Sequence, residues 1–322
     1  MKIGNLTFSV LSMACAGVMA YGSPSFAKDY PDKQIEIVVP YAAGGGTDLL
    51  ARAFADTAKK YASQPFGVIN KTGGAGAIGF SEIARSRPNG YKIGTGTVEL
   101  AMLPHMGLAN FTTKDFTPIA RLNAEPSAIT VKIDAPWNTY QEFMDYVKEN
   151  PTKVRVGNSG TGAIWHIAAA ALEEKTGAKL SHIPYDGGNP AVTALLGGHI
   201  EAVTVSSQEV SSQVDGGQLK MLAVMADERL AKYPDVPTLK ELGVDLTVAT
   251  WRGIVAPKNI PEDVTKKLRE ISKQTVEDPA FQETLNKMNL TSAYLDADEF
   301  AAAIEKDDAF FAETMKRLGI GQ

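Results

Sequence analysis

The residues with the clearest chemical potential form two glycine-rich turns, each between an apolar segment and a helix-like segment. The first reads Pro40-Tyr41-Ala42-Ala43-Gly44-Gly45-Gly46-Thr47-Asp48, and the second reads Thr72-Gly73-Gly74-Ala75-Gly76-Ala77-Ile78-Gly79. Glycine lets the main chain approach a ligand without a Cβ in the way. A helix that begins after such a turn presents unpaired N–H groups and the positive end of its dipole. The pair of turns therefore predicts a site for a carboxylate or a phosphate.

Main-chain groups are expected to do most of the binding at these turns. Neither turn contains an arginine, and Lys71 only flanks the second. The acid group would therefore contact main-chain N–H groups and bridging water, while the hydroxyl of Thr47 caps the helix. A purely structural interpretation stays open, in which the glycines only turn the chain and Thr47 and Asp48 are capping residues.

A third turn, Gly157-Asn158-Ser159-Gly160-Thr161-Gly162, nearly matches the G-x-S-x-G pattern of serine hydrolases. Thr161 occupies the place of the last glycine, and a hydrolase would also need a histidine that converges on Ser159. His166 lies within the following helix and is expected to pack or to cap the turn. The remaining histidines form no pair at helical spacing, so we predict no metal site. A secreted hydrolase that uses Ser159 stays open as an alternative.

The second turn also matches the dinucleotide fingerprint G-x-G-x-x-G over Gly74 to Gly79, and Glu99 follows 20 residues later. That fingerprint needs a tight turn directly after a strand, whereas Asn70-Lys71-Thr72 intervenes here. Glu99 also does not clearly stand at the end of a strand. We therefore predict no cofactor, and a dinucleotide-dependent enzyme is only a weak alternative.

The composition indicates a folded protein of about two domains. The chain has 322 residues, of which 44% are hydrophobic and 21% charged, with a formal net charge of -5. This balance excludes a disordered tail and a polytopic membrane protein. It also gives no basic footprint for nucleic acid.

Residues 1–27 are predicted to be a cleaved export signal. Lys2 precedes the uncharged and mostly apolar stretch 6–20, and Ser25-Phe26-Ala27 supplies small residues at a cleavage site after Ala27. The apolar stretch is too short for a spanning helix of about 20 residues. Cys15, the only cysteine, lies within this segment. Lipidation at Cys15 is the alternative, and after cleavage neither thiol catalysis nor a cysteine metal site is possible.

The rest of the chain alternates between strand-like and helix-like segments in two sets of similar size. Such alternation predicts an α/β protein of right-handed βαβ units, with two lobes that each contain a doubly wound, mainly parallel sheet flanked by helices. The predicted boundaries give one discontinuous lobe of residues 28–125 plus 249–322 and a second lobe of residues 126–248. Expected strands cover 35–39, 66–69, 91–97, 128–131, 154–156, 181–184, 201–205, 219–224 and 253–256, and expected helices cover 47–62, 78–87, 139–149, 164–176, 190–196, 261–276 and 297–318.

The order of these motifs resembles the solute receptors of tripartite tricarboxylate transporters, also called Bug proteins. The resemblance begins at Tyr30-Pro31-Asp32-Lys33 and extends to the C-terminus. Besides the three turns, it includes Pro88-Asn89-Gly90-Tyr91, His182-Ile183-Pro184-Tyr185, Leu195-Leu196-Gly197-Gly198, Pro234-Asp235-Val236-Pro237-Thr238 and Trp251-Arg252-Gly253.

The resemblance implies a two-lobed periplasmic binding protein of type II topology, which closes on a small organic carboxylate and passes it to inner-membrane transporter subunits. No catalysis, no nucleic-acid partner and a monomer are expected. A sensor that feeds a membrane kinase would use the same pocket and is the alternative. By position, the ligand-binding residues would be Tyr41, Ala43, Gly46, Thr47 and Asp48 from the first turn, Gly74, Gly76 and Ala77 from the second, Ser159, Thr161 and Ala163 from the third, and also Asp186 and Ser206.

Four positions depart from the family pattern. The family often has Pro at Thr72 and Asn at Ala77, commonly a polar residue at Ala163, and usually Lys or Arg at Asp186. The last two departures make the far end of the pocket less polar and more negative. We therefore expect a ligand whose distal end is apolar, aromatic or amine-bearing rather than a third carboxylate.

Overall fold

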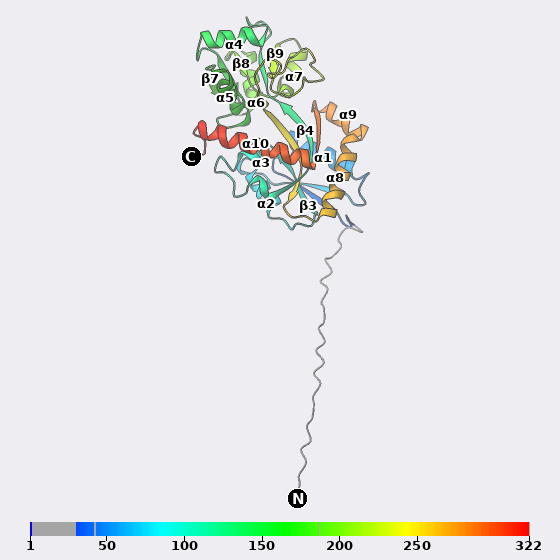
Figure 1. The fold of residues 1–322 in the computed structure, drawn as a ribbon. Helices are drawn as coiled ribbons and strands as arrows, with labels where there is room; N and C mark the ends of the chain where they lie inside the picture. The colour runs from blue at the N-terminus through cyan, green and yellow to red at the C-terminus, as the bar shows by residue number, and fades with distance from the viewer. Residues whose placement is uncertain (2–29, 42, 186, 322) are drawn as a thin grey trace.

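The computed structural model describes residues 1, 30–41, 43–185 and 187–321, which form two lobes (Figure 1). The predicted export signal, Cys15 and Asp186 lie outside the described residues. In Figure 1 the lobe with the N-terminal strands lies below, and the lobe with α4 to α7 lies above. Each lobe is built around its own sheet.

The sheet of the first lobe combines strands from both ends of the described chain. Its order is β11-β4-β10-β3-β1-β2. β1 reads Ile-Glu-Ile-Val-Val, an almost continuous apolar run that suits a strand covered on both faces. The strands are β1 (Ile35–Val39), β2 (Phe66–Asn70), β3 (Lys92–Thr97), β4 (Phe116–Pro126), β10 (Ala249–Pro257) and β11 (Ser292–Asp296).

The sheet of the second lobe repeats the same plan. Its order is β7-β6-β8-β5-β9. β6 lies between β7 and β8, the two strands that follow it in the chain. β5, the strand by which the chain enters the lobe, lies on the other side of β8. In the first sheet β1 and β10 take the corresponding places. The strands are β5 (Ala128–Lys132), β6 (Arg155–Asn158), β7 (Ser181–Pro184), β8 (Ala202–Val203) and β9 (Leu219–Val224).

The two-lobed α/β architecture is confirmed, but both sheets are mixed instead of mainly parallel. β1 is parallel to β2 and β3, and β6 is parallel to β7 and β8. The strands that carry the chain between the lobes run the other way, because a strand that returns from the opposite lobe enters the sheet from its far end. β10 is therefore antiparallel to β3 and β4, and β5 is antiparallel to β8 and β9.

Helices flank both sheets. In the first lobe they are α1 (Gly46–Ala58), α2 (Ala77–Ala84), α3 (Glu99–Met102), α8 (Glu262–Glu277), α9 (Pro279–Lys287) and α10 (Ala297–Arg317), with 3-10 turns at Gly74–Gly76 and Thr113–Asp115. In the second lobe they are α4 (Tyr140–Glu149), α5 (Ile164–Thr176), α6 (Gly188–Leu196) and α7 (Ser207–Asp215). No helix in these described ranges is both long and apolar enough to cross a membrane.

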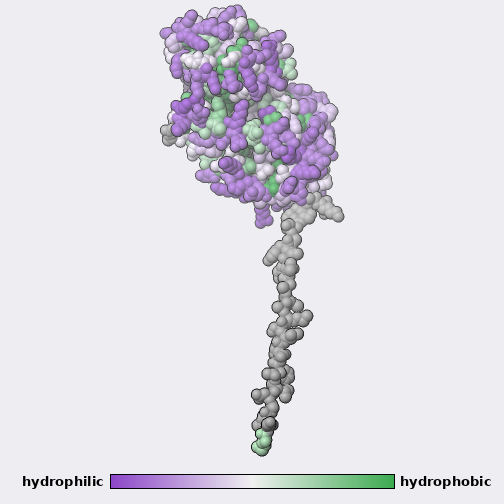
Figure 2. Space-filling model, in the orientation of Figure 1, coloured by the Kyte–Doolittle hydropathy of each residue, from purple (hydrophilic) through white to green (hydrophobic). Residues whose placement is uncertain are grey.

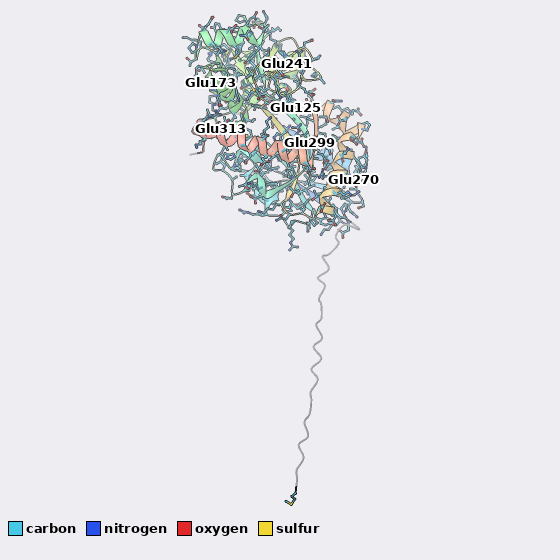
Figure 3. All side chains as sticks on the ribbon, viewed as in Figure 1. Glu125, Glu173, Glu241, Glu270, Glu299 and Glu313 are labelled. Carbon is cyan, nitrogen blue, oxygen red and sulfur yellow. The ribbon has the colours of Figure 1, made fainter. Side chains whose placement is uncertain are left out.

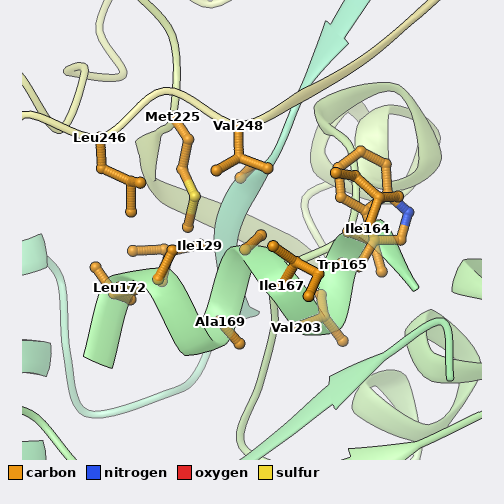
Figure 4. Close-up of a cluster of buried hydrophobic side chains, with 14 of the residues drawn as sticks. Ile129, Ile164, Trp165, Ile167, Ala169, Leu172, Val203, Met225, Leu246 and Val248 are labelled. Carbon is orange, nitrogen blue, oxygen red and sulfur yellow. The ribbon is translucent and has the colours of Figure 1, made fainter. Parts of the chain in front are cut away.

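The core of the second lobe is organised around α5, which is apolar around most of its circumference. Figure 4 shows its side chains, Ile164, Trp165, Ile167, Ala169 and Leu172 among them, facing residues from β5, β8 and the segments around β9. The facing residues are Ile129, Val203, Met225, Leu246 and Val248. Burial of an aliphatic or aromatic side chain stabilises a fold by about 1.5–3 kcal/mol, so α5 anchors the glycine-rich turn that precedes it. The outer face in Figure 2 is largely hydrophilic.

The two lobes are joined by β4 and β10, which we call the crossover ribbon. The two strands pair antiparallel from Phe116 opposite Pro257 to Pro126 opposite Ala249. Gly253 allows α10 to lie against this ribbon, because a Cβ there would come within 2.6 Å of the Phe300 ring. The indole Nε1 of Trp251 donates a hydrogen bond of 2.7 Å to Asp307 of α10.

The far end of α10 reaches the second lobe. Figure 1 shows α10 (red) lying across the junction of the lobes. Arg317 forms an ion pair with Glu174 of α5. Ile320 lies beside Gly162 of the third turn, within 3.6 Å of the position that a Cβ would take there.

Candidate functional site

A cleft of about 820 Å³ lies between the lobes, and it brings together parts of all three glycine-rich turns. The first turn contributes Gly46 to the lining, the second contributes Ala75, and the third contributes residues 159 to 163. The crossover ribbon contributes three polar side chains, and α3 and the N-terminal part of α7 add further residues. Its lining includes Glu99, Met102, Leu103, Met106, Glu125, Gly187, Gly188, Asn189, Ser206, Gln208, Glu209, Thr250 and Arg252.

Arg252 of β10 places a guanidinium directly at the first turn. Its Nε donates a hydrogen bond of 3.0 Å to Oγ1 of Thr47, and its Nη2 lies 3.5 Å from where a Cβ on Gly46 would stand. Its Nη1 is buried and has no hydrogen-bond partner among the described residues. A buried donor of this kind is costly unless a ligand or water satisfies it. The cleft therefore holds a cationic donor that is free for an anion.

This contact corrects the expected role of Thr47. Gly45 is the N-cap of α1, and no side chain caps that helix. The Thr47 hydroxyl instead accepts the hydrogen bond from Arg252. Arg252 lies 205 positions farther along the chain than Thr47. The residues around the start of α1 therefore could not show that the Thr47 hydroxyl binds Arg252 instead of capping the helix.

Asp48 holds the first turn in place from behind the cleft. Its buried carboxylate accepts hydrogen bonds from the N–H of Gly44 (2.8 Å), from Nε of Arg52 (2.9 Å) and from Nδ2 of Asn70 (2.9 Å). Burial alone would raise the pKa of Asp48, but these hydrogen bonds outweigh it and lower the pKa to about 2. Asp48 is not among the residues that line the cleft.

Tyr41 also lies behind the wall of the cleft. Its hydroxyl is 2.8 Å from Oγ1 of Thr97 and donates a hydrogen bond of 3.1 Å to the carboxylate of Glu99. Burial raises the pKa of Tyr41 well above its ordinary value, and the charge of Glu99 adds to the effect. Tyr41 therefore stays neutral and orients Glu99, which does line the cleft.

The second turn reaches the cleft only through Ala75. Ala75 has a positive φ of 54°, and the N–H groups of Gly76 and Ala77 donate to the carbonyls of Gly73 and Gly74. Gly74 and Ala77 line a neighbouring groove of about 560 Å³ together with Ile78. The hydrogen bonds within the turn therefore occupy two of the amides that the sequence assigned to the ligand.

The third turn is braced from within the second lobe. Oδ1 of Asn158 accepts from the N–H of Gly160 at 3.1 Å, and Nδ1 of His166 accepts from the N–H of Gly162 at 3.0 Å. Burial lowers the pKa of His166, and His182 at its ring edge lowers it further. His166 thus caps the turn, as predicted. The nitrogen that could serve Ser159 as a base is engaged elsewhere.

Ser206 is the N-cap of α7, at the cleft. Its hydroxyl accepts from the N–H of Glu209, and the Glu209 carboxylate accepts from the N–H (3.1 Å) and the hydroxyl (2.9 Å) of Ser206. This reciprocal capping box fixes the start of α7. The carboxylate of Glu209 consequently faces the cleft at a helix N-terminus.

Glu125 of β4 is a buried carboxyl side chain of the crossover ribbon. Figure 3 shows it at the junction of the lobes. Its carboxyl accepts a hydrogen bond of 2.6 Å from the N–H of Thr291. Burial raises the pKa of Glu125 to about 7, against smaller opposing contributions from Thr291, Arg252 and Asn123. Glu125 lines both the cleft and an adjoining hollow of about 480 Å³.

The structure thus sorts the predicted site residues. Gly46, Ser159, Thr161, Ala163 and Ser206 line the cleft. The others that are described do not line it, namely Tyr41, Ala43, Thr47, Asp48, Gly74, Gly76 and Ala77. No group of three or more potential metal ligands comes together within the described part of the chain.

Arg252 and Glu125 were not predicted as site residues, because only charged residues near the glycine-rich turns were considered. The available signal was a charged residue inside an otherwise apolar strand, in Trp251-Arg252-Gly253-Ile254-Val255 and in Asn123-Ala124-Glu125-Pro126. Lys, Arg, Glu and Asp are almost never fully buried unless they are paired. A charge in such a place is therefore a reason to consider the residue as a candidate for the site.

Comparisons with known proteins agree with this geometry. The family model described as "Tripartite tricarboxylate transporter family receptor" matches residues 50–320. A "UPF0065 protein in gbd 5'region" from Cupriavidus necator is 32% identical over 305 residues, which cover 94% of this chain and 91% of the relative.

Solved structures give the same result. A TctC solute-binding protein from Polaromonas is 45% identical with a TM-score of 0.86, over 89% of this chain and 99% of that chain. The periplasmic binding protein BugD is 31% identical with a TM-score of 0.70, over 90% of this chain and 99% of that chain. The chain therefore belongs to the receptor family of tripartite tricarboxylate transporters, which consists of periplasmic solute-binding proteins.

Proposed function

We propose that this receptor binds the carboxylate group of a small organic acid at Arg252 and delivers the acid to the membrane subunits of a tripartite transporter. The observation that carries the proposal is the guanidinium of Arg252, a residue that lines the cleft between the lobes and whose buried Nη1 lacks a hydrogen-bond partner among the described residues. The adjacent start of α1 adds the positive end of a helix dipole.

The first turn supports this anion site in two ways. Gly46 leaves room beside the guanidinium, since any side chain there would contact Nη2. Thr47 holds Nε, so the guanidinium is oriented before the ligand arrives. Charge-assisted hydrogen bonds to a preoriented guanidinium are among the stronger polar contacts in proteins. Tyr41, Ala43, Asp48, Gly74, Gly76 and Ala77 stay in the proposal as residues that shape the two turns, and Asp186 stays as a predicted contact.

The second lobe would complete the site on closure. Ser159 and Thr161 bring hydroxyl-bearing side chains to the cleft lining from the second lobe, and Ala163 and Ser206 also line it, although the Ser206 hydroxyl is engaged with Glu209. A ligand shifts an equilibrium between open and closed forms only by its differential affinity for them. These hydroxyls supply that difference, because they belong to the lobe that moves relative to Arg252. We propose the division into residues 28–125 plus 249–322 and residues 126–248 for the two moving lobes.

The proposal also includes the export of the protein, its oligomeric state and the absence of catalysis. The chain is exported, its signal is removed after Ala27, and the mature receptor acts as a monomer without catalysis. The hydrolase alternative loses support, because Nδ1 of His166 accepts a hydrogen bond from Gly162 and no histidine is among the described residues that line the cleft.

Thermal unfolding of the purified protein with a panel of organic acids tests this function. A ligand at one hundred times its Kd stabilises the folded state by about 2.7 kcal/mol, which raises the melting temperature measurably. We expect one or more acids to do so, and we expect Arg252→Gln to reduce the effect strongly at the same concentration of acid. If no organic acid raises the melting temperature of the wild type, the proposed function is wrong.

A further inference from the structure

The charges in the cleft are unbalanced for a site that binds acids. Its described lining contains one cationic side chain, Arg252, and three carboxyl side chains, Glu99, Glu125 and Glu209. A solute with two or three carboxylates would pair one of them with Arg252 and bring the others toward like charges. Like charges in a site of low dielectric repel strongly.

Arg252 and Glu125 lie on the same face of the crossover ribbon. Arg252 pairs with Asn123, and Thr250 pairs with Glu125, so the two charged residues are diagonal neighbours. Diagonal neighbours in an antiparallel pair are roughly 7–8 Å apart, and both side chains line the cleft. Arg252 and Glu125 form no ion pair with each other within 4 Å. The ribbon therefore presents a positive and a negative group side by side, both available to one small molecule.

Glu125 is the most buried of the three carboxyl side chains, at 2% exposure, and it is the one held by a single short hydrogen bond. Glu99 is held by Tyr41 and Thr97, and Glu209 is held by the N–H and the hydroxyl of Ser206. Glu125 has one short hydrogen bond, from the N–H of Thr291, whereas its contacts with Asn123 and the Thr291 hydroxyl are both 3.4 Å.

We propose that the solute is an aminocarboxylate, whose carboxylate pairs with Arg252 and whose protonated amine pairs with Glu125. This inference rests on the proposed function and narrows its ligand class. It gives each charge of the solute an opposite charge on a rigid pair of strands.

The number of protons released or taken up on binding gives an independent test of this arrangement. The pKa of Glu125 is about 7 because burial raises it, so the carboxyl is partly protonated at neutral pH. The charged groups around it are Arg252 from β10 and Glu209 from α7, and Lys232 lines the adjoining hollow, where it pairs with Asp215. An ammonium beside Glu125 favours the ionised form. Binding of an aminocarboxylate therefore releases a proton, whereas a second carboxylate in that place would take one up.

Isothermal titration calorimetry with matched probes tests the proposal. Each set contains an ω-amino acid, the monocarboxylate without the amine and the dicarboxylate of the same chain length, for example 4-aminobutanoate, butanoate and succinate. Titration at pH 7 in buffers of different ionisation enthalpy gives the number of protons exchanged. We expect the aminocarboxylate to bind at least tenfold more tightly than its monocarboxylate, the dicarboxylate to bind most weakly, and the aminocarboxylate to release protons.

Glu125→Gln should remove the tenfold advantage of the amine and the proton release together, while monocarboxylates still bind. Glu283→Gln, which changes an exposed carboxylate paired with Lys287, serves as the matched control. A dicarboxylate that binds more tightly than its aminocarboxylate, or proton uptake by the wild type, would overturn the inference even if Glu125→Gln failed to fold. If carboxylates bind but the dicarboxylate binds more tightly than the aminocarboxylate, the inference is wrong and the proposed function stands. If no acid binds, both the proposed function and the inference are wrong.

Discussion

Arg252 and Thr47 lie 205 positions apart in the chain, yet Nε of Arg252 donates a hydrogen bond of 3.0 Å to the Thr47 hydroxyl. This contact ties the crossover ribbon to the start of α1. It also aims the guanidinium at the open side of Gly46. An anion at this point meets a fixed cation and a helix N-terminus together, so little reorganisation is needed when it binds.

Replacement of Arg252 by glutamine should weaken binding of the carboxylate ligand about 10- to 100-fold, because a hydrogen bond to a charged group contributes about 1.5–3 kcal/mol. Calorimetric titration with an acid that stabilises the wild type gives the change. Arg87→Gln, at an exposed arginine away from the cleft, is the control. An affinity within twofold of the wild type would mean that main-chain groups alone hold the acid.

Gly46 offers a graded test of the space beside the guanidinium. A Cβ at this position would lie 3.5 Å from Nη2 of Arg252, which is an ordinary contact, so Gly46→Ala should bind and fold nearly as the wild type. The additional carbons of Gly46→Val enter the anion site and should abolish the ligand-induced rise in melting temperature. Circular dichroism of both variants checks folding. Equal binding by the valine and alanine variants would show that the first turn only changes the direction of the chain.

Asp48→Asn should destabilise the protein without direct loss of a ligand contact. The carboxylate has a pKa of about 2, below the usual 3.8, and each pKa unit corresponds to about 1.36 kcal/mol. Its contribution of about 2 kcal/mol is therefore present above pH 4 and lost as the pH falls toward 2. Urea unfolding of wild type and variant at pH 7 and pH 3 measures it. A difference in unfolding free energy that does not shrink at pH 3 would contradict this assignment.

Glu125 should make the ligand-free protein less stable as the pH rises. Its pKa is raised from 4.5 to about 7, so its protonated form stabilises the folded state fully below about pH 4.5. That stabilisation, about 3 kcal/mol, is lost as the pH rises through 7. Glu125→Gln should lack this loss. The measurement is the difference in unfolding free energy between wild type and Glu125→Gln from pH 5 to pH 8.

The difference between the two proteins is needed because Asp307 acts in the same direction. Burial raises the pKa of Asp307 to about 6. Its contribution is common to both proteins and cancels in the difference. Parallel pH profiles for wild type and Glu125→Gln would show that Glu125 does not titrate in this range.

Local patterns in the sequence were sufficient for the elements that carry a single continuous signal. β1, α5 and β9 have the predicted bounds, since each is a mainly apolar run or a helical pattern closed by glycine, proline or polar residues, and the short β7 also has its predicted bounds. β4, α3, α7, α9 and β11 were not predicted as elements. In β4, Arg121, Asn123 and Glu125 alternate with apolar residues at the period of two that is typical of a strand, so this element could have been predicted from the sequence.

The site was predictable only as far as its turns. The glycines and hydroxyls that follow strands were found, because their position at strand ends is a local property. The charges of the crossover ribbon were not found, because the face that a residue of β10 presents depends on its antiparallel register with β4. A shift of one residue would turn Arg252 and Glu125 away from the cleft. That register is set by pairing between segments more than one hundred residues apart, which no local window contains.

The paired strands of the crossover ribbon also restrict how the molecule can move. Two connections that are hydrogen-bonded to each other resist sliding and torsion more than they resist bending. In the proposed closure, binding of the ligand would therefore change mainly one quantity, the angle between the outer surfaces of the two lobes. A membrane subunit that rests on both surfaces at once could distinguish a loaded receptor from an empty one by shape alone, without touching the cargo.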